Sequence, residues 1–382
     1  MKIALGHSDD IDAHDAIKDV LEQCSSQLND EVPDAAILFS GIDFEHKTLL
    51  DEIYKAYPDI KLIGCTGDAE MSSKLGIVED SVVLACFSSK SIFFSSGVGH
   101  DVSKNVAEAA RKAVESAKNI LKETPKLCFV LHDTLTASGL KILSELKNNL
   151  PKDVPVLGGA AADHFRMEHS FQFSGNEVLE DSIAVLLIGG GVKFSYGVAA
   201  GRSTTGELQK VTSVIGNRVY KIGSQTAVEY YKKYLGTMDD VIGEFPLGVF
   251  DKNNKEHYLR APSHYHEDGS VVFFADIPEG SEVQVTVANR DEIVGAVKTA
   301  YEEAIKRYPG EKPALMQVTS CAGRKSVLGT KVKKEYELLK DFIQGLFPFI
   351  GYYGFGEICP LENNQDSKFH NETIVILLLG DE

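Results

Sequence analysis

The sequence predicts an α/β fold of mixed sheets covered by helices, built from three related modules with a mostly β insertion between the second and third. A glycine-rich stretch that runs from an apolar strand into a turn at or near an acid occurs three times, at residues 61–70, 155–164 and 349–357. Each copy is preceded by an apolar strand and followed by an acid and a hydroxyl that open a further strand. Repetition of this kind indicates a repeated structural unit.

Each module is predicted to open with a short strand, a capping residue and an amphipathic helix, at residues 1–24, 96–121 and 284–308. Apolar residues recur there at helical spacing, as at Ala13 and Ile17. The candidate helix caps are Ser8, Asp9, Ser103, Asn289 and Asp291.

The rest of each module follows the same order. Strands at residues 35–39, 127–131 and 314–318 lead into a second helix, and the glycine-rich stretch supplies the next strand. The last strand follows the acid and hydroxyl pair. Alternation of strands and helices favours sheets that are at least partly parallel and covered by helices.

The insertion is predicted to be mostly β. Gly216 and Asn217 between apolar runs indicate a hairpin, a short helix follows at residues 225–234, and further strands are expected at 245–250, 257–260 and 271–275. We therefore predict an N-terminal region, 1–200, and a C-terminal region, 201–382. The N-terminal region holds modules at about 1–95 and 96–200, and the C-terminal region holds the insertion, about 201–282, and the third module, about 283–382.

The composition narrows the functional classes. The 382 residues carry a formal net charge of −17 and no basic stripe, which argues against nucleic acid as a partner. No apolar run approaches the roughly 20 residues of a membrane helix, and the N-terminus turns polar too early for a secretion signal. The six cysteines are scattered, which fits reduced thiols. We expect a cytoplasmic chain with no membrane partner.

Ligands of such sheets bind beyond the carboxyl ends of the strands, where loops converge. Two loops per module end there, and those of the third module carry the polar groups. These groups lie in residues 319–324, at Glu335, in residues 356–360 and in residues 369–373. Since the modules otherwise share one pattern, this polar specialisation predicts the functional site.

The same residues resemble the FIST sensory family. The third module carries Ser320-Cys-Ala-Gly-Arg324, Glu335 at the start of a helix, Gly356-Glu-Ile-Cys-Pro360 and His370-Asn-Glu-Thr373. The likeness extends to Ile63-Gly-Cys-Thr66 and Glu79-Asp-Ser81 near the N-terminus, and to Gly216-Asn-Arg-Val-Tyr220 in the insertion, so that it covers nearly the whole chain. Cys359 departs from the family pattern.

The resemblance implies a ligand-sensing module of bacterial signal transduction, with amino acids and similar metabolites as ligands. Many relatives are fused to output domains. We expect this chain to be a free-standing sensor that signals through a partner protein such as a histidine kinase, with no cofactor and no enzymatic activity.

Arg324 and Glu357 are the predicted polar anchors of the ligand, because a guanidinium suits a carboxylate and a glutamate suits an ammonium group. Alternatively, Arg324 and Glu335 form a structural ion pair. The other candidate ligand-binding residues are Cys321, Tyr352, Gly356, His370 and Asn371. Nucleophilic catalysis by Cys321 with His370 and Asn371 is the less favoured interpretation.

Two alternative functions remain open. Some free-standing members of the family bind haem, sense nitric oxide and regulate a histidine kinase, and haem requires an axial ligand. The candidates are His164, His257, His264, His266 and Cys359, and His164 is expected at the position that Glu70 and Glu357 take in the other modules. The second alternative is a protein-interaction platform without a ligand.

Overall fold

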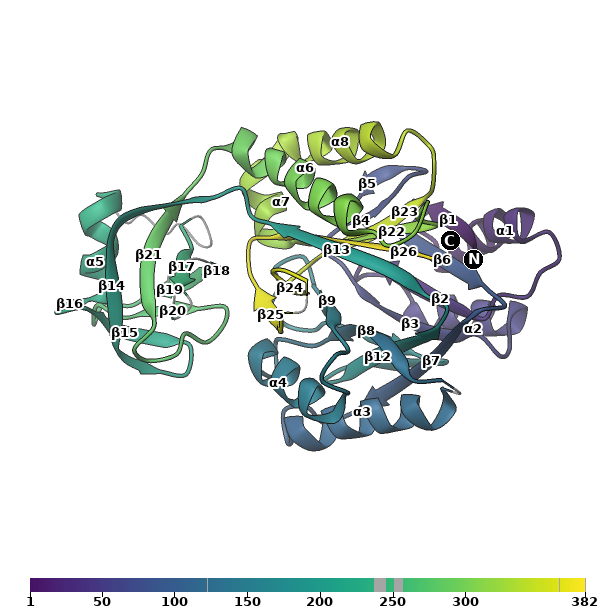
Figure 1. Ribbon diagram of the computed structural model, residues 1–382, viewed down its shortest axis with the longest axis horizontal. Coiled ribbons are helices and arrows are strands. Elements are labelled where there is room, and N and C mark those ends of the chain that lie inside the picture. The colour runs from purple at the N-terminus through teal and green to yellow at the C-terminus, as the bar shows by residue number, and fades with distance from the viewer. Residues whose placement is uncertain (122, 237–244, 251–256, 364, 382) are drawn as a thin grey trace.

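The computed structural model describes residues 1–121, 123–236, 245–250, 257–363 and 365–381. Three six-stranded sheets form the main body, and a fourth sheet belongs to the insertion, which lies to the left in Figure 1. The mixed α/β class predicted from the sequence is confirmed.

The three sheets of the body share one topology. The first has the order β1 (Lys2–Ser8), β6 (Val82–Ser88), β2 (Ala35–Ser40), β3 (Lys61–Thr66), β10 (Gln172–Ser174) and β11 (Glu177–Leu179). The second has β7 (Ile92–Gly99), β12 (Ile183–Gly190), β8 (Pro125–His132), β9 (Val156–Ala160), β24 (Glu357–Pro360) and β25 (Ser367–His370). The third has β13 (Lys193–Ala199), β26 (Ile374–Gly380), β22 (Leu315–Cys321), β23 (Phe349–Gly354), β4 (Glu70–Ser72) and β5 (Gly76–Val78). The central pairs β2 and β3, β8 and β9, and β22 and β23 are parallel, and the other neighbours are antiparallel.

The last two strands of each sheet form a hairpin that belongs to a different module. The hairpin β4–β5 pairs with β23, β10–β11 pairs with β3, and β24–β25 pairs with β9. Inner-facing side chains of all three sheets form one central hydrophobic core. The exchange therefore ties the modules to one another through both backbone hydrogen bonds and a shared core.

Helices cover the outer faces in three groups (Figure 1). They are α1 (Ala13–Leu28), α2 (His46–Ala56), α3 (Val106–Ile120), α4 (Gly139–Asn149), α6 (Arg290–Arg307), α7 (Ala322–Leu328) and α8 (Lys333–Ile343), with a 3-10 turn at Gly329–Val332. Asn289 caps α6 as predicted. Asp12 and Asn105 cap α1 and α3, so the predicted caps Ser8, Asp9 and Ser103 are wrong, because both helices begin a few residues later.

The insertion has its own sheet and core. Its elements are β14 (Ser203–Ile215), β15 (Arg218–Ile222), β16 (Gln225–Thr226), α5 (Ala227–Leu235), β17 (Leu247–Phe250), β18 (His257–Arg260), β19 (Pro262–Tyr265), β20 (Val271–Phe273) and β21 (Glu282–Val287). The hairpin predicted at Gly216 joins β14 to β15.

The third module begins earlier than the sequence suggested. Strand β21, expected to open that module, pairs with β14 and β17 of the insertion. Strand β13 pairs with β26 instead and occupies the edge that β1 and β7 hold in the other sheets. Strand β21 precedes a capped helix, as β1 and β7 do, so the local sequence suggests a first strand. Only the pairing shows that β21 belongs to the insertion.

Candidate ligand-binding site

The loops at the carboxyl ends of the parallel strand pairs meet at one place, which we call the strand-end junction. Ala162 N donates to Thr66 O at 2.9 Å, Asp68 N to Tyr353 O at 2.8 Å, and Ala160 N to the carbonyl of Gly356 at 2.9 Å. Each of these bonds crosses from one module to another. The predicted convergence of loops at this edge is therefore present in the structure.

Three buried polar residues occupy equivalent positions at the junction. Glu70, Gln172 and Glu357 each begin a hairpin, and they pair with Tyr352, Cys65 and Gly159 respectively. The counterpart of the two glutamates in the second module is thus Gln172, and the expectation of His164 was wrong. The loop before Gln172 is longer than its counterparts, which displaced the alignment of the repeats.

Glu357 is buried, and one of its two side-chain oxygens is hydrogen-bonded to Thr373. Its Oε2 accepts from Thr373 N at 3.1 Å and from Thr373 Oγ1 at 2.7 Å. Glu70 makes the same two contacts with Ser81, at 3.2 and 3.1 Å. Burial raises the pKa of both carboxyls from 4.5 to about 8, despite these hydrogen bonds. Burial therefore favours the protonated form of both carboxyls.

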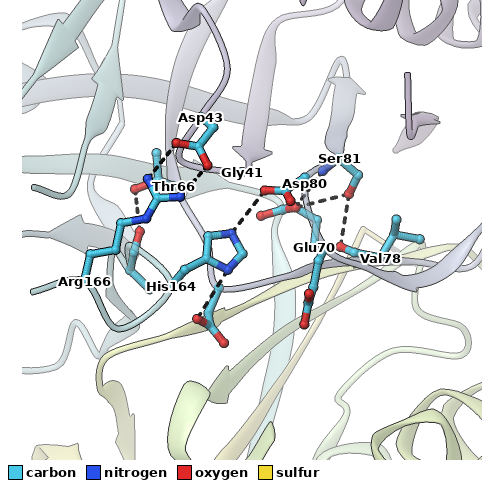
Figure 2. Close-up of polar contacts among 12 residues, drawn as sticks. Gly41, Asp43, Thr66, Glu70, Val78, Asp80, Ser81, His164 and Arg166 are labelled. Atoms are coloured by element: carbon cyan, nitrogen blue, oxygen red, sulfur yellow. Dashed lines mark hydrogen bonds and ion pairs between the residues drawn. The ribbon is translucent and has the colours of Figure 1, made fainter. Parts of the chain in front are cut away.

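His164 lies in the long loop of the second module, with its ring next to Asp80 of the first module (Figure 2). Its Nε2 is 3.2 Å from Asp80 Oδ1 and its Nδ1 is 3.8 Å from Asp68 Oδ1. In the same loop Arg166 forms a two-pronged ion pair with Asp43, at 2.6 and 2.5 Å. The φ angles at His164, Phe165 and Met167 are all near +57°, in the left-handed region. The ion pair of Arg166 with Asp43 and the contacts of His164 with Asp68 and Asp80 tie this loop to the first module.

Arg324 is fully buried in an internal ion pair. Its Nη2 donates to Glu335 Oε1 at 2.5 Å, and further donors reach Ala200 O at 2.9 Å and Ile293 O at 3.0 Å. Tyr353 donates its hydroxyl to the other oxygen of Glu335. The structure therefore contains the ion pair between Arg324 and Glu335 that the sequence offered as an alternative to ligand binding.

The remaining third-module candidates are also buried. Cys321 Sγ lies 4.0 Å from Glu372, and burial together with Glu357 and Glu372 raises the pKa of the thiol, contrary to the activation that a nearby arginine suggested. His370 Nε2 contacts Cys359 O at 2.8 Å, and burial lowers the pKa of its ring to about 4. Tyr352, Gly356 and Asn371 line the same interior. Tyr352 Oη and Asn371 Oδ1 have no hydrogen-bond partner among the described residues.

An open cavity lies between the insertion and the β24–β25 hairpin of the third module. Its volume is about 740 Å³. It is lined by Lys210, Phe250, Tyr258, Pro278, Glu279, Gly280, Ser281, Glu282, Leu361, Gln365, Asp366 and Lys368. A second cavity of about 880 Å³ lies on the other side of the hairpin, against α4 and β13. Neither cavity is lined by Arg324 or Glu357.

The residues proposed for haem do not fit that cofactor. Cys359 is buried with its Sγ 3.2 Å from Pro360 O, and the rings of His264 and His266 pack edge to face with their centroids 4.5 Å apart. His257 packs on Phe250, and His164 lies between two carboxylates. None of the five lines either cavity. Over the described residues, no group of three or more histidine, cysteine or acidic side chains is arranged to hold a metal.

The cavity residues were missed because packing between remote segments creates the cavity. Lys210 lies on β14, Tyr258 on β18 and Lys368 on β25. The sequence does carry one indirect signal, since the motif at His370 lies just beyond Lys368. In the described part of the chain, no helix is long and apolar enough to span a membrane.

Comparisons with known proteins agree with the resemblance. Residues 34–225 match the FIST N domain and residues 227–360 match the FIST C domain. An uncharacterised protein of Methanocaldococcus jannaschii is 28% identical over 326 residues, which are 78% of this chain and 61% of that protein. The chain thus spans about three fifths of that relative. A crystal structure of a cyanuric acid hydrolase from A. caulinodans aligns over 98% of both chains, with 7% identity and a TM-score of 0.35.

Proposed function

The chain belongs to the FIST family of signal-transduction sensors, and from that premise we propose that it binds a small amino-acid-like metabolite and signals through a partner protein. The FIST family is a sensory family and not a family of enzymes. The observation that carries the proposal is the cavity of about 740 Å³ between the insertion and the third module. Ligand sites are concave and often lie where two structural units meet.

The lining of this cavity suits a zwitterion. Lys210 and Lys368 supply cations for a carboxylate, whereas Glu279 and Glu282 supply acceptors for an ammonium group. Phe250 and Tyr258 add apolar surface for a side chain. The proposed anchors therefore differ from Arg324 and Glu357, although the ligand remains between the third module and the insertion.

Binding of a ligand in this cavity would be signalled by a change in how the insertion lies against the third module. It contacts both the insertion and the hairpin β24–β25, so it stabilises the arrangement in which the two are close. We propose that a signalling protein, such as a histidine kinase, recognises that arrangement.

The proposal is tested by thermal-shift measurements on the full chain with the twenty amino acids, each matched to a sodium chloride blank. At least one amino acid should raise the melting temperature, because a ligand that binds only the folded state stabilises it. Affinity for that ligand should fall in Lys368→Ala and persist in Lys298→Ala, whose side chain lies on the exposed face of α6. A screen without a hit, or equal affinities in both variants, contradicts the proposal.

A further inference from the structure

Arg260 is a buried cation at the boundary between the insertion and the body. It lies at the end of β18 with no exposed surface. Its Nε donates to Asp276 O at 2.9 Å, and its Nη1 donates to Leu259 O at 2.8 Å and to Phe369 O at 2.9 Å. Its Nη2 has no hydrogen-bond partner among the described residues. Two N–H groups of a buried guanidinium are thus without an acceptor.

The other buried arginines provide an internal comparison. Arg324 is paired with Glu335 at 2.5 Å, and Arg202 is paired with Glu372 at 2.8 Å, with all four side chains almost fully buried. Among the described residues, no carboxylate lies within ion-pair distance of Arg260. Asp276, whose carbonyl Arg260 binds, directs its carboxylate to Ser138 Oγ at 2.7 Å. The Asp276 carboxylate therefore acts on Arg260 only from beyond ion-pair distance, and a buried charge without a direct counterion is unfavourable.

The Arg260 side chain packs against a residue that lines the cavity. The Arg260 guanidinium stacks on the ring of Tyr258, with Cζ 4.2 Å from the ring centre. Tyr258 lines the cavity of about 740 Å³, and so does Lys368, which is adjacent in sequence to Phe369. Burial lowers the pKa of Arg260 to about 10, which leaves the group charged at neutral pH. A cation is therefore held behind one wall of the cavity.

We propose that Arg260 binds the carboxylate of the ligand through Nη2, and that the ligand reaches it past Tyr258. This inference rests on the proposed function and adds Arg260 to Lys210 and Lys368 as a cation for the carboxylate of the ligand. A carboxylate fits because the other three donors of the guanidinium are already used, which leaves one nitrogen to meet one or two oxygens. A phosphate, with more oxygens to satisfy, would leave most of them unmet in this apolar surrounding.

The experiment measures the melting temperature of the full chain in sodium acetate against sodium chloride at equal ionic strength. Acetate should raise the melting temperature of the unmodified protein, and Arg260→Gln should lose that increase. Arg260→Lys should keep part of it, because the charge remains. Arg218→Gln, an exposed arginine of the same insertion, should respond as the unmodified protein does. An equal acetate effect in Arg260→Gln, or no effect in the unmodified protein, overturns the proposal.

If Arg260→Gln fails to fold, a crystal structure of the unmodified full chain grown in acetate decides the question. A carboxylate on Nη2 supports the proposal. The proposal is overturned if the Asp276 carboxylate or a water occupies Nη2. It is also overturned by an adventitious ion only, that is, an ion at Nη2 whose binding does not change in Arg260→Lys.

The two proposals fail separately. If an amino acid binds with the same affinity in Arg260→Gln, the cavity is a ligand site but Arg260 does not select the carboxylate. If acetate acts through Arg260 while no amino acid binds, the carboxylate site stands and the ligand class of the proposed function is wrong. An amino acid that requires Arg260 should bind roughly ten- to a hundred-fold more weakly to Arg260→Gln.

Discussion

Glu357 is a carboxyl whose protonation is coupled to folding. In the unfolded chain it ionises near pH 4.5, and in the folded chain near pH 8. Between these values only the folded state holds the proton, so the free energy of unfolding falls as the pH rises from about 4.5 to about 8. Glu70 has the same raised pKa and contributes in the same window.

Glu357→Gln should remove this contribution. The second module carries Gln172 at the equivalent position, so an amide is compatible with the site. We expect the stability of the variant, relative to the unmodified protein, to be higher at pH 8 than at pH 5. Urea unfolding at both pH values checks this, with the exposed Glu177→Gln as the control. If the unfolding free energies of Glu357→Gln and the unmodified protein differ by the same amount at pH 5 and pH 8, Glu357 is not protonated in the folded protein.

Arg324 is expected to act in stability and not in ligand binding. Arg324→Ala leaves Glu335 buried without its partner, which should cost about 3–5 kcal/mol of unfolding free energy. Arg111, which forms an exposed ion pair on α3, serves as the control, and its replacement should cost little. Chemical denaturation measures both. A cost for Arg324→Ala no larger than that of the control would contradict the structural role.

The sequence predicted the pairing of Arg324 with Glu335 as an alternative, because charges at a loop-to-helix junction often pair. It did not reveal Arg260 or the role of Gln172. Arg260 ends a four-residue strand, and its guanidinium binds the carbonyls of Asp276 and Phe369, which are remote in sequence, so its burial has no local signature. The sequence repeats were aligned on His164 and not on Gln172, because the loop before Gln172 is longer than the equivalent loops of the other modules. Residue type could be read from the sequence, whereas burial and partners could not.

At the scale of elements, glycine permits close contact between the first strand of each sheet and the helix behind it. A Cβ at Gly97 would lie 2.2 Å from Ala113 O, and one at Gly197 would lie 2.0 Å from Ala300 O. Gly6 is in the same position against α1, at 2.4 Å from Val20 O. The helices can therefore pack directly on the backbone of these strands.

Gly197→Ala should force α6 away from β13 and destabilise the protein by about 1–3 kcal/mol. Gly295→Ala, in the exposed interior of α6 with nothing within 4 Å of the new Cβ, should stabilise it by about 0.5–1 kcal/mol. Thermal unfolding of both variants shows whether each substitution lowers or raises the stability of the protein. A stabilising Gly197→Ala would mean that α6 and β13 are not in close contact.

The elements themselves were largely predictable. Helical apolar spacing gave α1, α3 and α6, and the order of strands within each module is as expected. The exception is β21, whose alternating pattern and following helix imitate a first strand. Local patterning determines what forms at each position, and only pairing in the folded chain determines which sheet a strand joins.

At the scale of the whole molecule, the exchange of hairpins could not be predicted. The short hairpins β4–β5, β10–β11 and β24–β25 could pair with their own module or with another, because nothing in three or four residues specifies the partner. The central core shared by all three sheets favours the exchanged arrangement. We expect the body to unfold as a single cooperative unit.

The insertion occupies a loop position between β13 and α6. The equivalent strand-to-helix connections in the first two modules are short, at residues 9–12 and 100–105. Replacing residues 203–288 by a copy of 100–105, which keeps Arg202 and its buried ion pair with Glu372, should therefore leave the three sheets folded, which circular dichroism and a cooperative thermal transition check. Loss of the cooperative transition would show that the body depends on the insertion.

The most direct test of the central claim is calorimetric titration of the strongest amino-acid hit into the full chain and into this shortened chain. Because the cavity requires Lys210, Tyr258 and Glu282 from the insertion, the full chain should bind with one site and the folded shortened chain should not bind. Equal affinity in both chains would place the ligand within the three-sheet body and contradict the account.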